Sequence, residues 1–154
     1  MFIKYRVWDR KEQKFIFPIN ELKLDNNDNL LEVNGVKNEY INRFDKRFEL
    51  MRSSTCSDIT GKEIFERDII LIIANNPPDY LEVGTVRFEK GSFVVDDIAL
   101  KELVEIHSCQ LKIIGNSWEG VSIDINNGYK YTANELRQKI KNYLEKYEHP
   151  PKNN

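Results

Sequence analysis

The sequence predicts a mainly β protein (α+β by content): a small SH3-like β-barrel or meander with N-terminal hairpins and one C-terminal amphipathic helix. Three observations predict this class. Short apolar segments alternate with polar residues and are separated by Gly, Pro, Asn and Asp turn signals. The most apolar run, residues 69–73, consists almost wholly of β-branched residues. Clear helical spacing of apolar residues begins only after residue 132.

The first third of the chain is predicted to form paired strands. Pro18 ends the second of them, because proline cannot donate to a strand ladder. The Asn and Asp run at residues 25–29 is typical of a turn between two short strands. Residues 36–46 are polar and weakly patterned, so we expect a loop there. The predicted strands of this part are residues 2–8, 14–17, 22–24, 30–33 and 47–51.

The middle of the chain is predicted to form a meander that is the core of the barrel. Its β-branched run, residues 69–73, suits a strand that is covered on both faces. Lys90 and Gly91 form a tight turn, and Gly115 and Asn116 a later one. Residues 100–106 fit helical and strand spacing equally well, so this segment stays open. Further strands are predicted over residues 80–89, 92–96 and 111–114.

The clearest helix is the last element. Thr132 is placed to cap it, and Glu135 three residues later completes a capping box. Pro150 and Pro151 stop it. Apolar side chains recur at helical spacing and are expected to dock on the barrel, with a basic face left in water. These apolar residues are Leu136, Ile140, Tyr143, Leu144 and Tyr147.

Composition limits the classes of function. A chain of 154 residues with 40% hydrophobic side chains has the size of one domain and enough apolar material for a core. Its net charge of −2 is unevenly spread: residues 53–124 hold 6 basic and 13 acidic side chains, whereas residues 1–52 hold 11 and 9. The acidic middle repels phosphate, so any nucleic-acid surface would lie in the N-terminal part or on the last helix.

The cellular compartment is predicted from two features: the sequence has no run long enough for a membrane helix and no signal segment. The longest uncharged apolar run ends after a few residues, far short of the roughly 20 that a membrane helix needs, and no signal segment opens the chain. Cys56 and Cys109 are 53 positions apart, and without an export signal we expect reduced thiols. We therefore expect a cytoplasmic protein that has no membrane partner.

Several chemical sites are considered and set aside. His107, Cys109 and Cys56 offer three metal ligands, but a structural zinc site needs four at characteristic spacings, so no metal is expected. Glycine-rich phosphate loops are missing from the sequence, and no cofactor is expected. A carboxylate cluster before the apolar strand is interpreted as tying down a turn rather than as acid and base. Its members are Glu63, Glu66 and Asp68.

Three segments, in this order and spacing, resemble the YopX family of bacteriophage and prophage proteins. The first is Tyr5-Arg6-Val7-Trp8-Asp9, the second runs from Gly61 to Ile70, and the third is Ile113-Ile114-Gly115-Asn116. The matching motif residues are Arg6, Trp8, Asp9, Gly61, Glu63, Ile64, Glu66, Asp68, Gly115 and Asn116. Two family glycines are replaced, by Cys56 and Arg67, so any tight turn that depends on them must be built differently here.

The resemblance implies a phage or prophage origin and work inside the bacterial cell, but it supplies no catalytic residues. It covers the chain to about residue 119, so we expect a YopX-like β domain over 1–119 and a helical extension over 120–154. An enzyme is not expected. We expect a binding or adaptor protein that contacts a host or phage protein, with a homo-oligomer as a further option.

The alternative function is a nucleic-acid-binding module formed by the N-terminal hairpin and the basic helix. Basic residues set among aromatic ones can hold a single strand by stacking bases above a phosphate track. The opposing interpretation is that these aromatics belong to the core. The residues of this alternative are Lys4, Arg6, Trp8 and Lys14.

Overall fold

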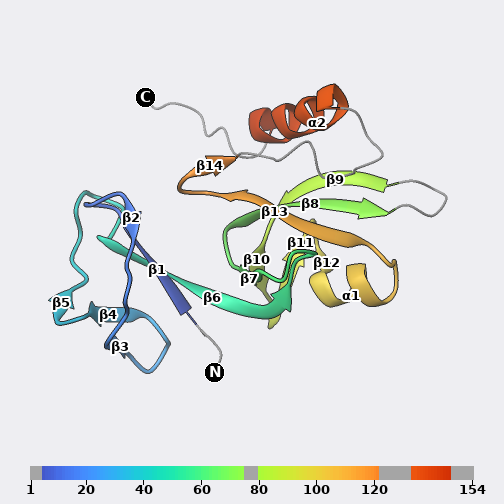
Figure 1. Ribbon diagram of the computed structural model, residues 1–154. Coiled ribbons are helices and arrows are strands. Elements are labelled where there is room, and N and C mark those ends of the chain that lie inside the picture. Colours follow the sequence, from blue (N-terminus) through green and yellow to red (C-terminus); the bar gives the residue numbers. More distant parts are fainter. Residues whose placement is uncertain (1–4, 75–79, 122–132, 147–154) are drawn as a thin grey trace. The chain divides into compact units, whose positions relative to one another are not determined.

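A computed structural model describes residues 5–74, 80–121 and 133–146 of the chain (Figure 1). The contacts divide the chain into two compact units, an N-terminal unit of residues 1–55 and a C-terminal unit of residues 56–154. The mainly β class is confirmed, and the sheets are curled. The predicted domain boundary between residues 119 and 120 stays a prediction.

Two antiparallel groups of strands form the N-terminal unit. β1 lies between β2 and β6, and β4 lies between β3 and β5. Trp8 of β1 pairs with Phe15 of β2. The core of this unit is a small cluster around Val7, Val33 and Phe48. The strands are β1 (Tyr5–Asp9), β2 (Lys14–Phe15), β3 (Leu22–Leu24), β4 (Leu30–Val33), β5 (Val36–Lys37) and β6 (Phe48–Ser57), the last of which extends beyond the unit.

The segment predicted as a loop, residues 36–46, is more regular than its sequence suggests. It contains β5 and a bridge between Tyr40 and Lys46. The Asn38 side chain anchors the segment, because its amide donates to the carbonyls of Leu30 and Phe48 at 3.1 and 3.2 Å and its oxygen accepts from the Phe48 N–H at 2.8 Å. A hairpin that is held by one asparagine side chain needs no regular alternation of apolar and polar residues, so the sequence pattern did not predict it.

The C-terminal unit contains two antiparallel sheets and two helices. One sheet has the order β14-β13-β8-β9 and the other has the order β10-β11-β12. The elements are β7 (Glu63–Phe65), β8 (Asp68–Ala74), β9 (Tyr80–Thr85), β10 (Arg87–Glu89), β11 (Ser92–Val95), β12 (Ile98–Ala99), α1 (Leu100–Glu105), β13 (Gln110–Asn116), β14 (Gly120–Val121) and α2 (Ala133–Lys146).

β8 is buried on both faces, as its β-branched sequence predicted. Ile70 and Ile72 belong to one core cluster, and Ile69, Leu71 and Ile73 belong to another. Alternate side chains of a strand point to opposite faces, so this one strand feeds both cores. The cores lie on the two faces of the sheet that β8 shares with β9 and β13.

Several elements differ from the prediction. The strand predicted over residues 80–89 is divided into β9 and β10, which belong to different sheets. The strand predicted over 14–17 ends at Phe15, and the one predicted over 47–51 continues to Ser57. Residues 100–105, left open between helix and strand, form the short helix α1, so the described chain has two helices where one was predicted. Leu100 and Leu103 bury its inner face. Gly115 and Asn116, predicted as a turn, belong to β13, and a bulge lies between Ile113 and Gly115.

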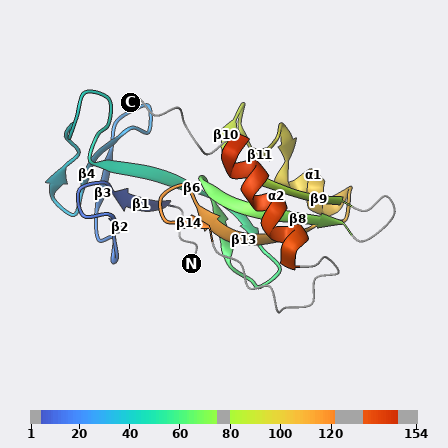
Figure 2. The ribbon, with the colours of Figure 1, turned by 90° about the horizontal axis from the view of Figure 1, so that it is seen from above.

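Helix α2 covers the sheet over β9 (Figures 1 and 2). Ile140 and Tyr143 bury its inner face in the second core cluster. The Tyr143 hydroxyl lies 2.5 Å from the Thr85 hydroxyl, and the Lys139 ammonium lies 3.1 Å from a Glu82 carboxylate oxygen. Parts of the helix prediction fall outside the described residues: Thr132, Tyr147, Pro150, Pro151 and the side chains of Leu136 and Leu144.

Neither helix within residues 5–74, 80–121 and 133–146 is long and apolar enough to cross a membrane.

Candidate functional site

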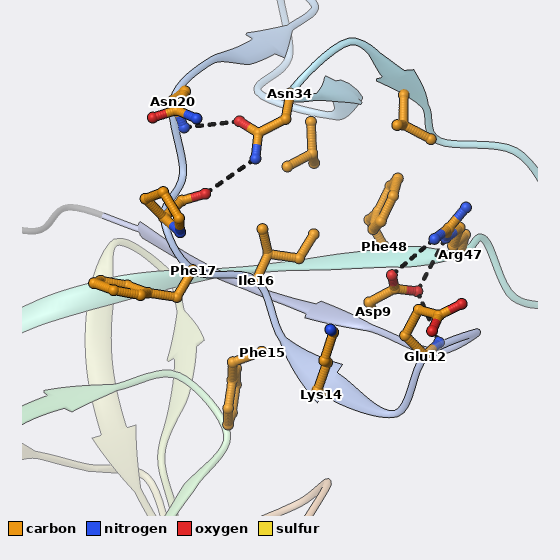
Figure 3. A pocket seen from close by; sticks show the side chains of 13 residues that line it. Asp9, Glu12, Lys14, Phe15, Ile16, Phe17, Asn20, Asn34, Arg47 and Phe48 are labelled. Atoms are coloured by element: carbon orange, nitrogen blue, oxygen red, sulfur yellow. Dashed lines mark hydrogen bonds and ion pairs between the residues drawn. The ribbon is translucent and has the colours of Figure 1, made fainter.

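An open pocket in the N-terminal unit is the candidate binding site (Figure 3). It has a volume of about 530 Å³. Its walls come from the β1–β2 turn, the segment between β2 and β3, the β4–β5 turn and the start of β6. The lining residues are Asp9, Glu12, Lys14, Phe15, Ile16, Phe17, Pro18, Asn20, Val33, Asn34, Val36, Arg47 and Phe48.

One wall is held by an ion pair between Asp9 and Arg47. The guanidinium Nε of Arg47 donates to Oδ1 of Asp9 at 3.0 Å, and Nη2 donates to Oδ2 at 2.9 Å. The same Oδ1 accepts the backbone N–H groups of Lys11 at 2.9 Å and Glu12 at 3.2 Å. The carboxylate therefore fixes the β1–β2 turn and joins it to the start of β6.

The protonation state of Asp9 follows from these contacts. Burial alone raises the pKa of this carboxyl, but the hydrogen bonds from Arg47 and from two backbone N–H groups outweigh it, so the pKa lies below its usual range. The bond to Asp9 in turn raises the pKa of Arg47. A carboxylate with a lowered pKa and both oxygens engaged is a poor proton acceptor, which favours a structural role over a catalytic one.

The opposite wall is held by the side chain of Asn34. Its Oδ1 accepts the backbone N–H groups of Asn20 at 2.7 Å and Glu21 at 3.0 Å, and its Nδ2 donates to the Pro18 carbonyl at 3.0 Å. The backbone of Asn34 has φ +50°, a left-handed conformation that asparagine tolerates. These bonds tie the segment before β3 to the β4–β5 turn.

Between these walls the pocket has a lining of mixed polarity. Val33 and Phe48 supply buried side chains, whereas the Phe17 side chain at the rim is 92% exposed. Glu12 and Lys14 add one exposed charge of each sign. An unburied aromatic side chain at the edge of a hollow is the kind of surface that an apolar group of a partner covers.

The nucleic-acid residues predicted on the first hairpin are not arranged for base stacking. Trp8 is 3% exposed, and its ring packs edge-on against Phe15 with the centroids 4.9 Å apart. The Arg6 guanidinium lies 4.8 Å from the Phe15 ring centroid. Lys14 is exposed, and Lys4 lies outside the described residues. The structure therefore gives Trp8 the core role, with no open ring face.

The central family-like segment forms the β7–β8 turn. Asp68 is buried, and its Oδ2 accepts the Phe65 N–H at 2.8 Å. This bond confirms the interpretation of the acidic residue before the apolar strand as one that ties down a turn. The other motif residues of this segment are Gly61, Glu63, Ile64 and Glu66, of which Ile64 is fully buried in the core.

The late motif is also structural. A Cβ on Gly115 would meet the Gly120 carbonyl oxygen at 2.0 Å, so only glycine fits here. Oδ1 of Asn116 accepts the N–H groups of Trp118 at 2.9 Å and Glu119 at 2.8 Å. Asn116 thereby shapes the turn that leads to β14.

Sequence reasoning missed Asp58, which organises the C-terminal unit in the same manner. Its carboxylate accepts the N–H and the hydroxyl of Thr60 at 2.8 and 2.7 Å, the N–H of Lys62 at 3.1 Å and the N–H of Ile113 at 3.0 Å. Burial raises its pKa, but these bonds outweigh burial and lower it. The local signal was the segment Asp58-Ile59-Thr60-Gly61, in which an Asp two residues before Thr-Gly is typical of an Asx turn.

The three side chains considered as metal ligands, His107, Cys109 and Cys56, do not form a metal-binding cluster within the described part of the chain. No group of three His, Cys, Asp or Glu side chains there is placed to hold a metal ion. Cys109 is buried, and burial raises the pKa of its thiol. His107 lies 3.3 Å from Glu102 at the surface. Neither side chain lines the pocket.

The pocket combines residues that the sequence did not group. Phe15 and Phe17 were noted as aromatics of the first hairpin, but Asn34 was interpreted only as part of a turn, and Arg47 only as the start of a strand. Asp9 and Arg47 are 38 positions apart, so no local pattern indicates their pairing. A polar pair at such a separation is visible only after folding.

Two solved structures share the fold. The crystal structure of protein EF1440 from Enterococcus faecalis has 20% sequence identity and a TM-score of 0.54, over 77% of this chain and 96% of that chain. The X-ray structure of protein yopX from Bacillus subtilis has 22% identity and a TM-score of 0.52, over 78% and 96%. No curated protein matches the chain.

The family comparison agrees with this likeness. The model of the YopX protein family matches residues 4–122, which include both compact units up to β14. The matched range also includes all three segments in which the sequence resembles the family. The chain therefore belongs to the YopX protein family.

Proposed function

We propose that this YopX-family protein is a non-enzymatic binding or adaptor protein, and that the pocket of the N-terminal unit takes an apolar segment of a partner protein. The observation that carries the proposal is Phe17, whose side chain is 92% exposed at the rim of a hollow of about 530 Å³. The partner is a protein of the phage or of its bacterial host, met in the cytoplasm, as the family resemblance implies.

The energetics support a binding role. Burying an aromatic side chain that is otherwise exposed contributes on the order of 1.5–3 kcal/mol. The walls are already ordered by the Asp9–Arg47 pair and by the bonds of Asn34, so little ordering remains to be done on binding. An apolar segment can therefore enter without breaking an existing hydrogen bond.

The chemistry of the lining argues against catalysis. Asp9 has a lowered pKa and is held by Arg47, so it does not serve as a general base. The lining side chains include no serine, cysteine or histidine that could act as a nucleophile. What the pocket offers is shape, apolar surface and two exposed charges, Glu12 and Lys14.

The proposal is tested by capture from phage-infected bacterial lysate, with and without nuclease. Three tagged baits are compared: the wild-type chain, Phe17→Ser and Phe44→Ser. Phe44 is a matched control because it is also an exposed phenylalanine of the same unit, at 81%, but does not line the pocket. We expect a nuclease-resistant protein on the wild-type and Phe44→Ser baits and its loss on Phe17→Ser.

Two outcomes would overturn the proposal. Equal capture by the Phe17→Ser bait would show that the pocket is not the binding site. Loss of all captured material on nuclease treatment would favour the nucleic-acid alternative. That alternative further predicts binding that weakens steeply with salt and fails when Lys4, Arg6 and Lys14 are neutralised.

A further inference from the structure

The strand β2 lies beside the pocket and is an edge of its sheet. In the order β2-β1-β6-β7 it has a neighbouring strand on one side only, which is β1. Its two residues, Lys14 and Phe15, both line the pocket. The backbone groups on the outer side of an edge strand are open to pairing with another extended chain. The register of β1 and β2 decides which groups lie on that side.

The outer side of β2 carries the backbone N–H and carbonyl of Phe15. Phe15 pairs with Trp8, but the hydrogen bond at this position joins the Ile16 N–H to the Val7 carbonyl at 3.0 Å. Phe15 and Trp8 are thus a non-hydrogen-bonded pair, in which the backbone groups point away from the paired strand. Among the described residues neither backbone group of Phe15 makes a hydrogen bond, and the same holds for the backbone of Phe17.

The other edge strands of this unit are less suited to pairing beside the pocket. β3 contributes no residue to the pocket lining. β5 contributes one, Val36, but the carbonyl of its neighbour Lys37 already accepts the Glu39 N–H at 3.1 Å. β2 is therefore the edge at which an added strand lies next to the pocket and finds both main-chain partners open.

The side chains of an added strand alternate between the two faces of the sheet. Trp8 and Phe15 share one face, where their rings pack edge-on, whereas Ile16 points in the opposite direction, on the side of the pocket (Figure 3). A residue directly opposite Phe15 lies on the face of the Phe15 ring, and its two neighbours in the added strand lie on the other face. An added strand can thus place side chains on the pocket side while its backbone pairs with β2.

We infer that the partner segment binds as an extended peptide that adds a strand to the outer edge of β2. This inference rests on the proposed function and specifies the conformation of the segment that the pocket takes. An extended backbone offers a free acceptor and a free donor to the Phe15 N–H and carbonyl, whereas the backbone groups of a helix are bonded to each other. β2 has only two residues, so main-chain bonds are few, and burial of the exposed Phe17 side chain supplies part of the affinity.

Amide hydrogen exchange of the free chain, followed by NMR, tests whether the edge is open. The Phe15 N–H should exchange at least about 100-fold faster than the Ile16 N–H, because only the latter is bonded to β1. The two amides are neighbours in the chain, so Ile16 is the matched control. Equal protection of the two amides would show that the outer edge is already covered, and it would overturn the inference.

A proline at position 15 tests the main-chain bond itself. Phe15→Pro removes the outward N–H, and an edge strand tolerates proline where that N–H faces away from the sheet. Phe15→Ala is the matched control, because it loses the same ring and keeps the N–H. In the capture from phage-infected lysate, the Phe15→Pro bait should retain at least about tenfold less of the captured protein than the Phe15→Ala bait. Thermal unfolding of both variants checks that they are folded.

The outcomes separate this inference from the proposed function. Loss of capture on Phe17→Ser, together with equal capture by Phe15→Pro and Phe15→Ala, would leave the pocket as the binding site and overturn strand addition. A wild-type bait that captures no protein would overturn both. Capture of further copies of this chain alone would show that the edge pairs with itself, and it would overturn the partner segment as the occupant.

Discussion

The two units differ in how they use apolar side chains. Six of the ten large apolar side chains that are exposed among the described residues belong to the N-terminal unit, which is the shorter one. They are Phe17, Leu31, Val36, Tyr40, Ile41 and Phe44. The C-terminal unit instead buries its apolar side chains in two core clusters on the faces of β8. The N-terminal unit therefore exposes more of its large apolar side chains, and the C-terminal unit has the larger core.

The family motif residues occur in both units and have structural roles in each. Asp9, Asp68 and Asn116 all accept backbone N–H groups at turns, and Gly115 allows β13 to pass close to β14. None of the exposed aromatics Phe17, Tyr40 and Phe44 belongs to a motif. This difference teaches that the shared residues specify a scaffold, while the exposed aromatic side chains lie outside the motifs, although the motif residue Asp9 also holds one wall of the pocket.

The largest loss of stability is expected from a substitution at Gly115, one of the motif residues of the scaffold. Alanine there places a Cβ 2.0 Å from the Gly120 carbonyl oxygen, a backbone atom that cannot move without separating β13 from β14. We expect Gly115→Ala to cost about 3 kcal/mol or more of unfolding free energy in denaturant titration.

Gly61→Ala is the matched control, because a Cβ at Gly61 meets nothing within 4 Å and only its φ of +89° is unfavourable. Its expected cost is about 1–2 kcal/mol. Equal costs at the two glycines would show that close approach is not the reason for Gly115.

A smaller loss of stability, which depends on pH, is expected from a substitution of Asp58. Asp58→Asn removes the charge that four hydrogen bonds stabilise, and we expect a loss of about 1.5–3 kcal/mol at neutral pH. The folded-state pKa of Asp58 lies below its unfolded value, so its contribution is complete above the unfolded pKa and is lost as pH falls through the folded one. The variant should lose less stability than the wild type between about pH 5 and pH 2, measured by thermal unfolding. Parallel pH profiles would contradict this assignment.

The fold was predictable where local chemistry decides it. The β-branched run identified β8 and its two buried faces, and the Asn-Asp run at 25–29 marked the turn between β3 and β4. Pro18 did not mark the end of β2, which stops earlier, at Phe15. Segment 36–46 was not predictable, because Asn38 stabilises it through bonds to two other strands. The helix at 100–105 stayed open because its two buried leucines fit either period.

The candidate site was predictable only in part. Asp9 was found through its motif, but its partner Arg47 is far away in sequence and belongs to no motif. The exposure of Phe17 and Phe44 could not be foreseen either, since phenylalanine side chains are usually buried. For Trp8 the sequence left two interpretations, base stacking and the core, and its burial agrees with the second. Exposure is a property of the folded surface, and pattern reasoning does not reach it.

A modest gain in stability is expected at Arg67, where the chain departs from its family. In the resemblance to the family motif, Arg67 stands in place of a glycine, and it adopts φ +73°, a left-handed conformation that is strained for a residue with a side chain. We expect Arg67→Gly to stabilise the protein by about 0.5–1 kcal/mol, the relief of strain minus the entropy of glycine and the lost contact of Arg67 with the Trp118 ring. A destabilised variant would show that the contact with Trp118 outweighs the strain.

The smallest change in unfolding free energy is expected at the two most exposed phenylalanines, and it tests whether their side chains belong to the scaffold or to a binding surface. Phe17→Ser and Phe44→Ser should each change the unfolding free energy by less than about 0.5 kcal/mol, because side chains that are 92% and 81% exposed contribute little to the core. Val33→Ser is the contrast within the same unit, since Val33 is 1% exposed and its truncation should cost at least about 2 kcal/mol. Should either phenylalanine cost as much as Val33, its side chain would be part of the scaffold. A negligible cost leaves binding as the role that accounts for two exposed aromatic rings in a unit with so small a core.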